Sequence, residues 1–289
     1  MENYVICMDT SGDIDPKVLD EYEVEFVPME YLVGEEKHLA TGPEKEEVMK
    51  AFYAAQRTGV ETRTSQITPY VYQETFRKYL DQGRDVMYFC LSSGLSSTCE
   101  SARLTVEELK EDYPDRKIYV VDTLSATGGI GFMLTRAVEN RKNGMSIEEN
   151  YESIMALIPR MCHFFMVEDL MYLLRGGRVS ASSAYVGSML NIKPILKIDE
   201  KGELATIAKK RGHKGAVAHL AELFEEHYDP SMGNVVYMCD GDARELQDKL
   251  KEKLLEKHPD LEFHQTYLCP VIGAHTGPGM ISEIFIGKE

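Results

Sequence analysis

The sequence predicts an α/β protein with two lobes. We expect an N-terminal three-layer α/β lobe with a mainly parallel sheet and a C-terminal α+β lobe with a mainly antiparallel or mixed sheet. In the first half, continuous apolar runs alternate with amphipathic segments, as in parallel sheets covered by helices on both faces. The second half mixes a hairpin pattern with helices. The rhythm changes near residue 160, so the lobes are expected at 1–160 and 161–289.

The N-terminal lobe is expected to contain four buried strands and five helices. Apolar runs predict strands at Tyr4–Asp9, Val24–Val33, Val86–Ser92 and Ile118–Thr123. Amphipathic patterns predict helices at Glu44–Arg57, Pro69–Gln82, Ser96–Asp112, Gly131–Asn143 and Ser146–Ile158. Ser146 and Glu149 have the spacing of a capping box, which favours a helix start at that point.

The C-terminal lobe begins with a predicted strand at Met161–Val167, a Gly-Gly-Arg turn and a helix-like stretch to Leu190. Ile195–Ile198 and Leu204–Lys209 flank a glycine-containing turn, which predicts a β-hairpin. Helices are then expected at 213–227 and 242–257, and strands at 234–239, 262–269 and 281–286.

Composition excludes several classes of protein. Hydrophobic residues make up 43% and charged residues 28% of the chain, which is ordinary for a folded protein with a sizeable core. The formal net charge of −16 repels nucleic-acid phosphates and anionic membranes, so neither is an expected partner. The six cysteines include no CxxC pair, which favours buried thiols over disulfides or a zinc site. No apolar run reaches the roughly 20 residues of a transmembrane helix or resembles a signal peptide, so we expect a cytoplasmic protein without stable membrane insertion.

Four segments rich in hydroxyls and glycines suggest a ligand site. They are residues 9–13, 64–68, 92–98 and 122–129, and all but the second directly follow a predicted strand. Ligands of open α/β sheets bind beyond the carboxyl ends of the strands. Any one segment could simply cap a helix. Together they favour a hydroxyl-lined mouth that suits an anion, either a carboxylate or a phosphate.

The common catalytic motifs are absent from the sequence. There is no GxxxxGK[ST] phosphate loop, no G-x-S-x-G nucleophile elbow and no HExxH metal motif. Gly129-Ile130-Gly131 lacks the third glycine of a dinucleotide fingerprint. We therefore expect no cofactor, no metal and no catalytic residues.

Two further features admit either a structural or a functional interpretation. Glycines and a proline around His275 in the segment Gly273–Gly279 predict a tight turn, which could also let His275 donate a hydrogen bond into the cleft between the lobes. Basic residues gather at 175–178 and 209–211 in an otherwise acidic chain. These islands are either solvated charge or a docking surface for an acidic or phosphate-bearing partner.

These motifs, in order over essentially the whole chain, resemble those of the DegV family. They are Asp-Thr-Ser-Gly-Asp at 9–13, Thr-Ser-Gln at 64–66, Ser-Ser-Gly-Leu-Ser at 92–96, Val-Asp-Thr at 121–123 with Gly-Gly at 128–129, Gly-Gly-Arg at 176–178, Lys-Pro-Ile-Leu at 193–196 and Gly-Ala-His-Thr-Gly-Pro-Gly at 273–279. The resemblance implies one long-chain fatty acid, about C14–C18, held between two lobes. It also implies the role of the fatty-acid-binding subunit of a bacterial fatty acid kinase, whose separate ATP-dependent subunit phosphorylates the acyl carboxylate.

The resemblance also carries binding roles over to particular residues. Thr64 and Ser93 would hold the carboxylate, and His275 would belong to the same polar network. Ser65 and Ser92 are weaker candidates for that network. A carboxylate removed from water must be hydrogen-bonded, which hydroxyls and backbone amides could accomplish.

The resemblance also implies docking roles for two arginines, and the sequence departs from the family pattern at three positions. Arg178 and Arg211 would lie on the kinase-docking face. Ile67 stands where the family usually has proline, and Ser97 and Cys99 stand where a glycine and an aromatic residue are typical. The departures do not touch the expected carboxylate ligands, but they could alter the loops and hence the acyl chain that fits.

Two other classes of function remain open. One is a stand-alone acyl hydrolase or phosphotransferase that uses Ser93 with His275. The other is a fatty-acid carrier or sensor without a kinase partner. A monomer is expected in each case, since no long apolar helix face calls for a symmetric partner.

Overall fold

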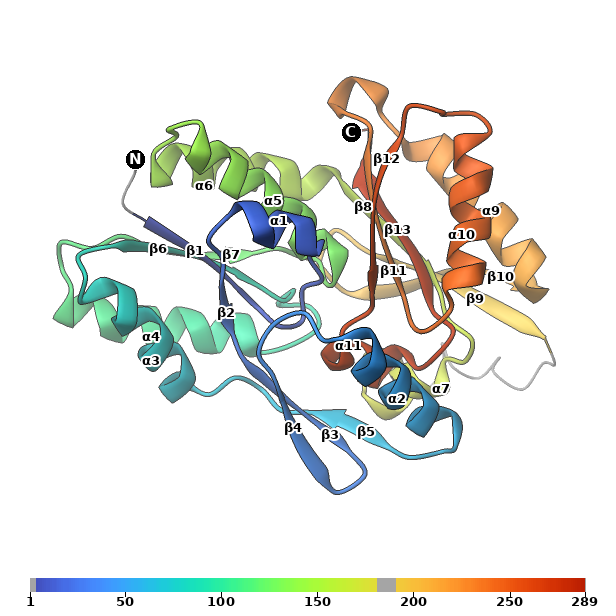
Figure 1. Ribbon diagram of the computed structural model, residues 1–289, viewed down its shortest axis with the longest axis horizontal. Helices are drawn as coiled ribbons and strands as arrows, with labels where there is room; N and C mark the ends of the chain where they lie inside the picture. The colour runs from blue at the N-terminus through green and yellow to red at the C-terminus, as the bar shows by residue number, and fades with distance from the viewer. Residues whose placement is uncertain (1–3, 181–190, 289) are drawn as a thin grey trace.

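The computed structural model describes residues 4–180 and 191–288, which form two larger sheets and a small three-stranded one, with helices packed on them (Figure 1). The first sheet is wholly parallel and has the order β2-β1-β6-β7. Its strands are β1 (Tyr4–Asp9), β2 (Glu25–Val27), β6 (Asp85–Cys90) and β7 (Ile118–Asp122). Helices α3 (Pro69–Leu80) and α4 (Thr98–Asp112) cover one face, and α1 (Pro16–Glu21), α5 (Gly128–Lys142) and α6 (Ile147–Leu157) cover the other. The predicted three-layer lobe is confirmed.

The segment predicted as one strand at Val24–Val33 is two strands in different sheets. After β2, Pro28 interrupts the chain, and β3 (Met29–Val33) joins an antiparallel sheet of order β4-β3-β5. Proline has no N–H to donate to a ladder, so the strand direction can change there. The short strands β4 (Glu36–Ala40) and β5 (Thr62–Thr64) precede and follow α2 (Glu46–Arg57) and were not predicted.

The second sheet is mixed and has the order β10-β9-β8-β13-β11-β12. Its strands are β8 (Met161–Met166), β9 (Ile192–Ile198), β10 (Leu204–Arg211), β11 (Val235–Asp240), β12 (Glu262–Tyr267) and β13 (Ile281–Ile286). All neighbours are antiparallel except β11 and β12, which are parallel. Helices α9 (Gly212–His227) and α10 (Arg244–Leu255) cover one face. The mixed C-terminal sheet and the β9–β10 hairpin are confirmed.

Helix α5 packs against both sheets, and its glycines permit the close approach. A Cβ atom on Gly128 would lie 2.9 Å from Cys239 Sγ of β11, and one on Gly131 would lie 2.0 Å from the carbonyl oxygen of Asp13. Phe132 of the same helix packs on Tyr237 of β11. Helix α5 therefore sets the spacing between the two halves of the protein.

The segment Gly273–Gly279 is only partly the predicted turn. Residues Pro270–Thr276 form helix α11, which places His275 in the last helical turn. The turn itself follows at Gly277 and Gly279, whose φ values are 75° and 88°. Proline at the first helical position favours a helix start, which explains why the helix extends into the glycine-containing segment.

Other predicted elements are confirmed or fall outside the described residues. The capping box is present, with the Ser146 and Glu149 side chains each bonded to the other's backbone N–H. The stretch predicted as helix-like up to Leu190 contains α7 (Met171–Arg175), while residues 181–190 lie outside the described part. Short 3-10 turns occur at Ile158–Arg160 and Pro230–Met232. None of the helices described is long and apolar enough to cross a membrane.

One carboxyl group lies in an apolar environment. Glu283 of β13 is fully buried opposite Phe164 of β8, and Phe164 belongs to the cluster beneath α9 and α10. Neither carboxyl oxygen has a hydrogen-bond partner among residues 4–180 and 191–288. Burial raises the pKa of Glu283 well above its usual value.

This burial predicts a pH-dependent stability cost. A folded pKa above the unfolded value of about 4.3 means that the native state binds more protons, so stability falls as pH rises through that window. We expect Glu283→Met to raise the free energy of unfolding more at about pH 8 than at about pH 5, by about 1.4 kcal/mol for each pH unit over which the native carboxyl retains its proton. Urea unfolding at both pH values measures this. Glu283→Gln is the control, because it removes the titrating group and keeps a polar side chain of similar size. Parallel plots of unfolding free energy against pH for wild type and Glu283→Met would contradict a raised pKa of Glu283.

Candidate functional site

A cavity of about 260 Å³ lies between the parallel sheet and the mixed sheet. Its wall is mostly apolar and is built from both halves of the chain. The apolar lining residues are Met29, Leu91, Leu95, Ala126, Phe165, Leu173, Ile198, Leu204, Val271, Ile272 and Met280. Such a wall suits a flexible hydrocarbon group rather than a polar metabolite.

Hydroxyls and an imidazole gather in one part of the cavity wall. Thr64 Oγ1, at the end of β5, lies 2.8 Å from His275 Nε2. Ser65 and Gln66 follow Thr64 along the wall. The Gln66 side-chain amide donates to the Ser97 carbonyl over 3.2 Å and accepts from the Ser97 hydroxyl over 3.1 Å. These bonds join the segment after β5 to the loop before α4, so the two hydroxyl-rich segments act as one surface.

Helix α11 holds His275 in place through backbone contacts with the N-terminal half. Gln56 Nε2 donates to the carbonyl of Gly273 over 2.9 Å, and Thr62 Oγ1 donates to the carbonyl of Ala274 over 3.1 Å. On the other side, Gly176 follows α7, and a Cβ atom there would lie 2.4 Å from His275 Nδ1. The absence of a side chain at position 176 is therefore required for the observed position of the imidazole.

The imidazole is neutral at physiological pH. Burial, and to a smaller extent the positive charge of Arg178, lower the pKa of His275 to about 4. Arg178 also lines the cavity; its Nε donates to the Leu95 carbonyl over 3.2 Å, and its guanidinium also bonds the Gly176 carbonyl. The polar part of the wall thus combines neutral hydrogen-bonding groups with one fixed cation, which suits an anionic head group.

Ser92 and Ser93, expected from the sequence to bind the carboxylate, lie outside the cavity wall. Ser92 is buried, and its hydroxyl donates to the Gly202 carbonyl over 2.7 Å, which ties the loop to the β9–β10 turn. Ser93 is exposed, and its backbone amide donates to Asp122 Oδ1 over 3.1 Å. Neither residue lines the cavity. The structure brings Thr64, Ser65 and His275 together but not Ser92 or Ser93.

Residues Ser96 and Ser97 line the cavity in their place and were missed as site candidates. Ser96 Oγ lies 2.8 Å from Thr98 Oγ1 and accepts the Thr98 amide over 3.2 Å. A signal existed in the sequence, because Ser96 lies in the hydroxyl-rich segment 92–98 and begins the predicted helix Ser96–Asp112. Which serine of that segment faces inward depends on the path of the loop, which the sequence did not define.

The first hydroxyl-rich segment, residues 9–13, holds a loop of the cavity wall in place. Asp9 is fully buried, and its carboxylate accepts the amide of Leu91 over 2.9 Å and the hydroxyl of Tyr88 over 2.9 Å. It also accepts the amide and hydroxyl of Ser11. Asp9 therefore fixes the start of the loop that carries Leu95 and Ser96, although residues 9–13 do not line the cavity.

A second histidine lines the cavity and was not predicted. His163 of β8 is buried, with Nδ1 3.3 Å from Ser125 Oγ, and burial lowers the pKa of His163 to about 3. Thr127, with a φ of 53°, also lines the cavity at the start of α5. Of the two predicted docking arginines, Arg178 is half-buried at the cavity, while Arg211 is exposed at the end of β10.

The fold and this cavity define a class: two-lobed α/β proteins with a mainly apolar cavity between the lobes. A family model described as "uncharacterised protein, DegV family" matches residues 3–288, and the chain belongs to the DegV family. A DegV domain-containing protein of Streptococcus pyogenes serotype M3 is 34% identical over 288 residues, covering 99% of each chain.

Solved structures show the same fold. A DegV lipid-binding protein of Thermotoga maritima is 29% identical, with a TM-score of 0.83 and coverage of 100% of this chain and 99% of that one. The fatty acid kinase (Fak) B3 protein of Streptococcus pneumoniae, loaded with linoleic acid, has a TM-score of 0.87 at 22% identity and covers 100% of both chains. The resemblance to the DegV family and the fold class expected from the sequence are both confirmed.

Half-buried His275 and buried His163 predict acid sensitivity. Their folded pKa values lie below the unfolded value of about 6.5. Their contribution to the free energy of unfolding is therefore complete above that pH and is lost as the pH falls toward about 4 for His275 and about 3 for His163. Each contributes up to about 1.4 kcal/mol per pH unit. We expect His275→Gln to reduce the loss of unfolding free energy on acidification by up to about 1.4 kcal/mol per pH unit between pH ~6.5 and ~4, measured by urea unfolding of delipidated protein. An unchanged slope would show that His275 is not neutral in the folded state.

Proposed function

We propose that this chain binds one long-chain fatty acid, of about C14–C18, in the inter-lobe cavity and presents its carboxylate in the cytosol to a separate ATP-dependent kinase subunit. The observation that carries the proposal is the cavity, whose apolar wall from both lobes also contains the Thr64–His275 pair. The lipid-binding relative of Thermotoga maritima and the linoleic-acid-loaded Fak B3 protein support it.

The acyl tail supplies the affinity. Burying a methylene contributes about 0.8 kcal/mol, so a C16 tail contributes roughly 12 kcal/mol before the costs of association are subtracted. Leu91 and Ile198 are buried wall residues in one cluster, while Gln66 and Ser97 are exposed. The tail therefore points into the protein, and the carboxylate lies at the side nearer to solvent.

The head group would be bound by neutral donors and one cation. Thr64 Oγ1 and Ser96 Oγ can each donate a hydrogen bond, with Ser65 as a further donor. In the Nε2–H tautomer, neutral His275 would donate to Thr64 Oγ1 and orient the Thr64 hydroxyl toward the head group. Arg178 lowers the pKa of His275 by its positive charge, and the same charge would stabilise an anion beside the imidazole. A carboxylate out of water requires such partners.

The alternative of a stand-alone hydrolase has less support. Ser93 is exposed and does not line the cavity with His275, so the expected nucleophile–base pair is not formed. The charge acting on His275 is that of Arg178 rather than a carboxylate that would orient it as a general base. The site therefore favours binding over turnover.

The first test concerns the ligand. We expect native mass spectrometry of the purified protein to show one fatty acid per chain, and added C14–C18 acids to raise the melting temperature of delipidated protein. Thr64→Val and Ser96→Ala should each weaken binding about 10- to 100-fold, since each removes a hydrogen bond to a charged group. Ser93→Ala is the matched control, because its side chain is exposed outside the cavity.

The outcomes of this test separate the candidate residues. Loss of binding in Ser93→Ala but not in Ser96→Ala would contradict the proposed head-group site. A chain that carries no fatty acid and is not stabilised by one would contradict the whole proposal, and a hydrolase screen with acyl esters would follow.

The second test concerns the kinase. Arg211 is exposed at the start of α9, and exposed Lys209 lies two residues earlier in β10. We expect Arg211→Glu to lower ATP-dependent acyl phosphate formation at least about tenfold, because charge reversal disfavours the docking of an acidic partner surface. Acyl phosphate trapped as the hydroxamate gives the rate, and fatty-acid affinity should stay unchanged. Wild-type protein that yields no acyl phosphate with any kinase subunit of its own bacterium would favour a carrier or sensor.

A further inference from the structure

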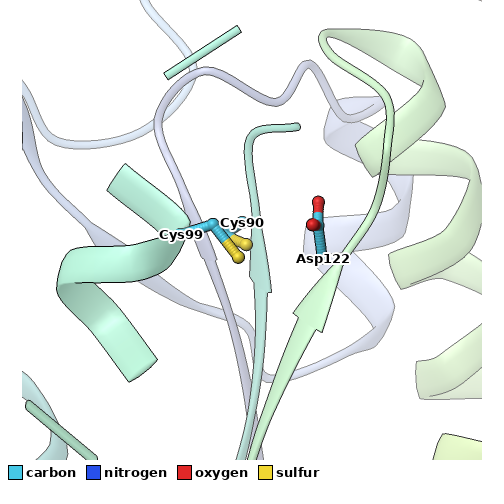
Figure 2. Close-up of side chains that lie close together, drawn as sticks. All are labelled: Cys90, Cys99 and Asp122. Atoms are coloured by element: carbon cyan, nitrogen blue, oxygen red, sulfur yellow. The ribbon is translucent and has the colours of Figure 1, made fainter. Parts of the chain in front are cut away.

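Two cysteines and an aspartate converge at the carboxyl edge of the parallel sheet, although no sequence motif predicted this cluster. Cys90 is the last residue of β6, Asp122 is the last residue of β7 and its register partner, and Cys99 lies in the first turn of α4. Figure 2 shows the two sulfur atoms side by side and Asp122 on the neighbouring strand. The ligand atoms of the three side chains all lie within 4.8 Å of one another.

The surroundings of Asp122 orient its carboxylate. Oδ1 accepts the backbone amides of Ser93 and Leu124, over 3.1 and 3.3 Å. Arg103 Nη2 lies 3.6 Å from Oδ2, beyond direct hydrogen-bond distance. Backbone amides that fix one oxygen of a carboxylate are the kind of support that orients metal ligands. The side chain of Asp122 is 12% exposed, whereas both cysteines are fully buried.

We propose that Cys90, Cys99 and Asp122 form a binding site for a thiophilic divalent cation of the zinc class. Two soft sulfur ligands and one carboxylate are a zinc-type donor set, and a water molecule on the partly exposed Asp122 side would complete a tetrahedron. In a tetrahedral site with metal–sulfur bonds of about 2.3 Å, the ligand atoms lie about 3.5–3.8 Å from one another. The distances between the three side chains therefore need to shorten by roughly 1 Å when the ion binds. The site does not suit magnesium or calcium, because these ions prefer oxygen donors.

The chemistry of binding leaves the charge of the buried site unchanged. The divalent ion forms two metal–thiolate bonds, and the two thiol protons leave to solvent. Two positive charges therefore enter as two leave, and Arg103 continues to offset Asp122. Ion entry thus adds no net charge to the protein interior.

The site lies outside the proposed fatty-acid site but adjoins it. None of Cys90, Cys99 and Asp122 lines the cavity, whereas Leu91, Leu95 and Ser96, on the loop between the two cysteines, do. A bound ion would join the two ends of that loop. Metal binding is therefore testable whether or not the protein binds a fatty acid.

The test is metal titration of the full chain kept reduced with a phosphine. We expect one Co²⁺ per chain, with thiolate-to-metal charge-transfer absorption, displaced by Zn²⁺, and two protons released per ion in weakly buffered solution. Zn²⁺ affinity, measured by competition with a chromophoric chelator, should fall at least about 100-fold in Cys99→Ala and about 10-fold in Asp122→Asn. Cys162→Ala, which removes a half-buried thiol from β8, is the matched control and should bind as wild type does.

Several results would overturn the site. Folded, reduced protein without the charge-transfer band would do so, as would equal Zn²⁺ affinity in wild type and Cys99→Ala. Circular dichroism and melting temperature establish whether each variant folds. If Cys99→Ala does not fold, the near-isosteric Asp122→Asn decides alone, and unchanged affinity in that variant contradicts the proposed ligand set.

Discussion

The burial of helix α5 between two sheets is the constraint on which the rest of the structure depends. Gly128 approaches β11 of the mixed sheet, and Gly131 approaches the carbonyl of Asp13 beside the parallel sheet, so the helix fits between them only without side chains at these positions. The sheets can pack closely along the helix but not beyond its N-terminal end, where Ala126 and Thr127 line the cavity. The cavity is thus a consequence of how one helix joins the lobes.

The polar residues of the hydroxyl-rich segments have two roles in the structure: some hold a loop in place, and others line the cavity. Ser92 and Asp9 hold the loop after β6. The Ser92 hydroxyl donates to the β9–β10 turn, and the Asp9 carboxylate accepts the Leu91 amide. A Cβ atom on Gly94 would lie 2.6 Å from the carbonyl carbon of Gly202, so this contact between the lobes is backbone against backbone. Because these groups are satisfied internally, the loop presents Ser96 and Leu95 to the cavity in a fixed orientation.

Periodicity predicted most of the fold, because continuous apolar strands and amphipathic helices are local patterns. It failed where local patterns are weak: Pro28 separates two strands within one apolar run, and β4 is short and polar. For the site, the expected Thr64 and His275 do meet, since both lie on elements that pack together. Ser96 and the Cys90–Cys99 pair depend on the path of one loop, and side chains nine positions apart give no periodic signal.

The electrostatics of the cavity support the proposed binding of an anion over catalysis within the cavity. A general base needs a pKa near the working pH, whereas burial and Arg178 hold the pKa of His275 at about 4. Such an imidazole is a poor proton acceptor at neutral pH but a good neutral donor to an oxygen. A carboxylate bound beside it would remain ionised and keep its nucleophilic oxygen near the exposed Gln66 and Ser97. An ionised acyl oxygen close to the surface is what a phosphoryl donor on a second protein would require.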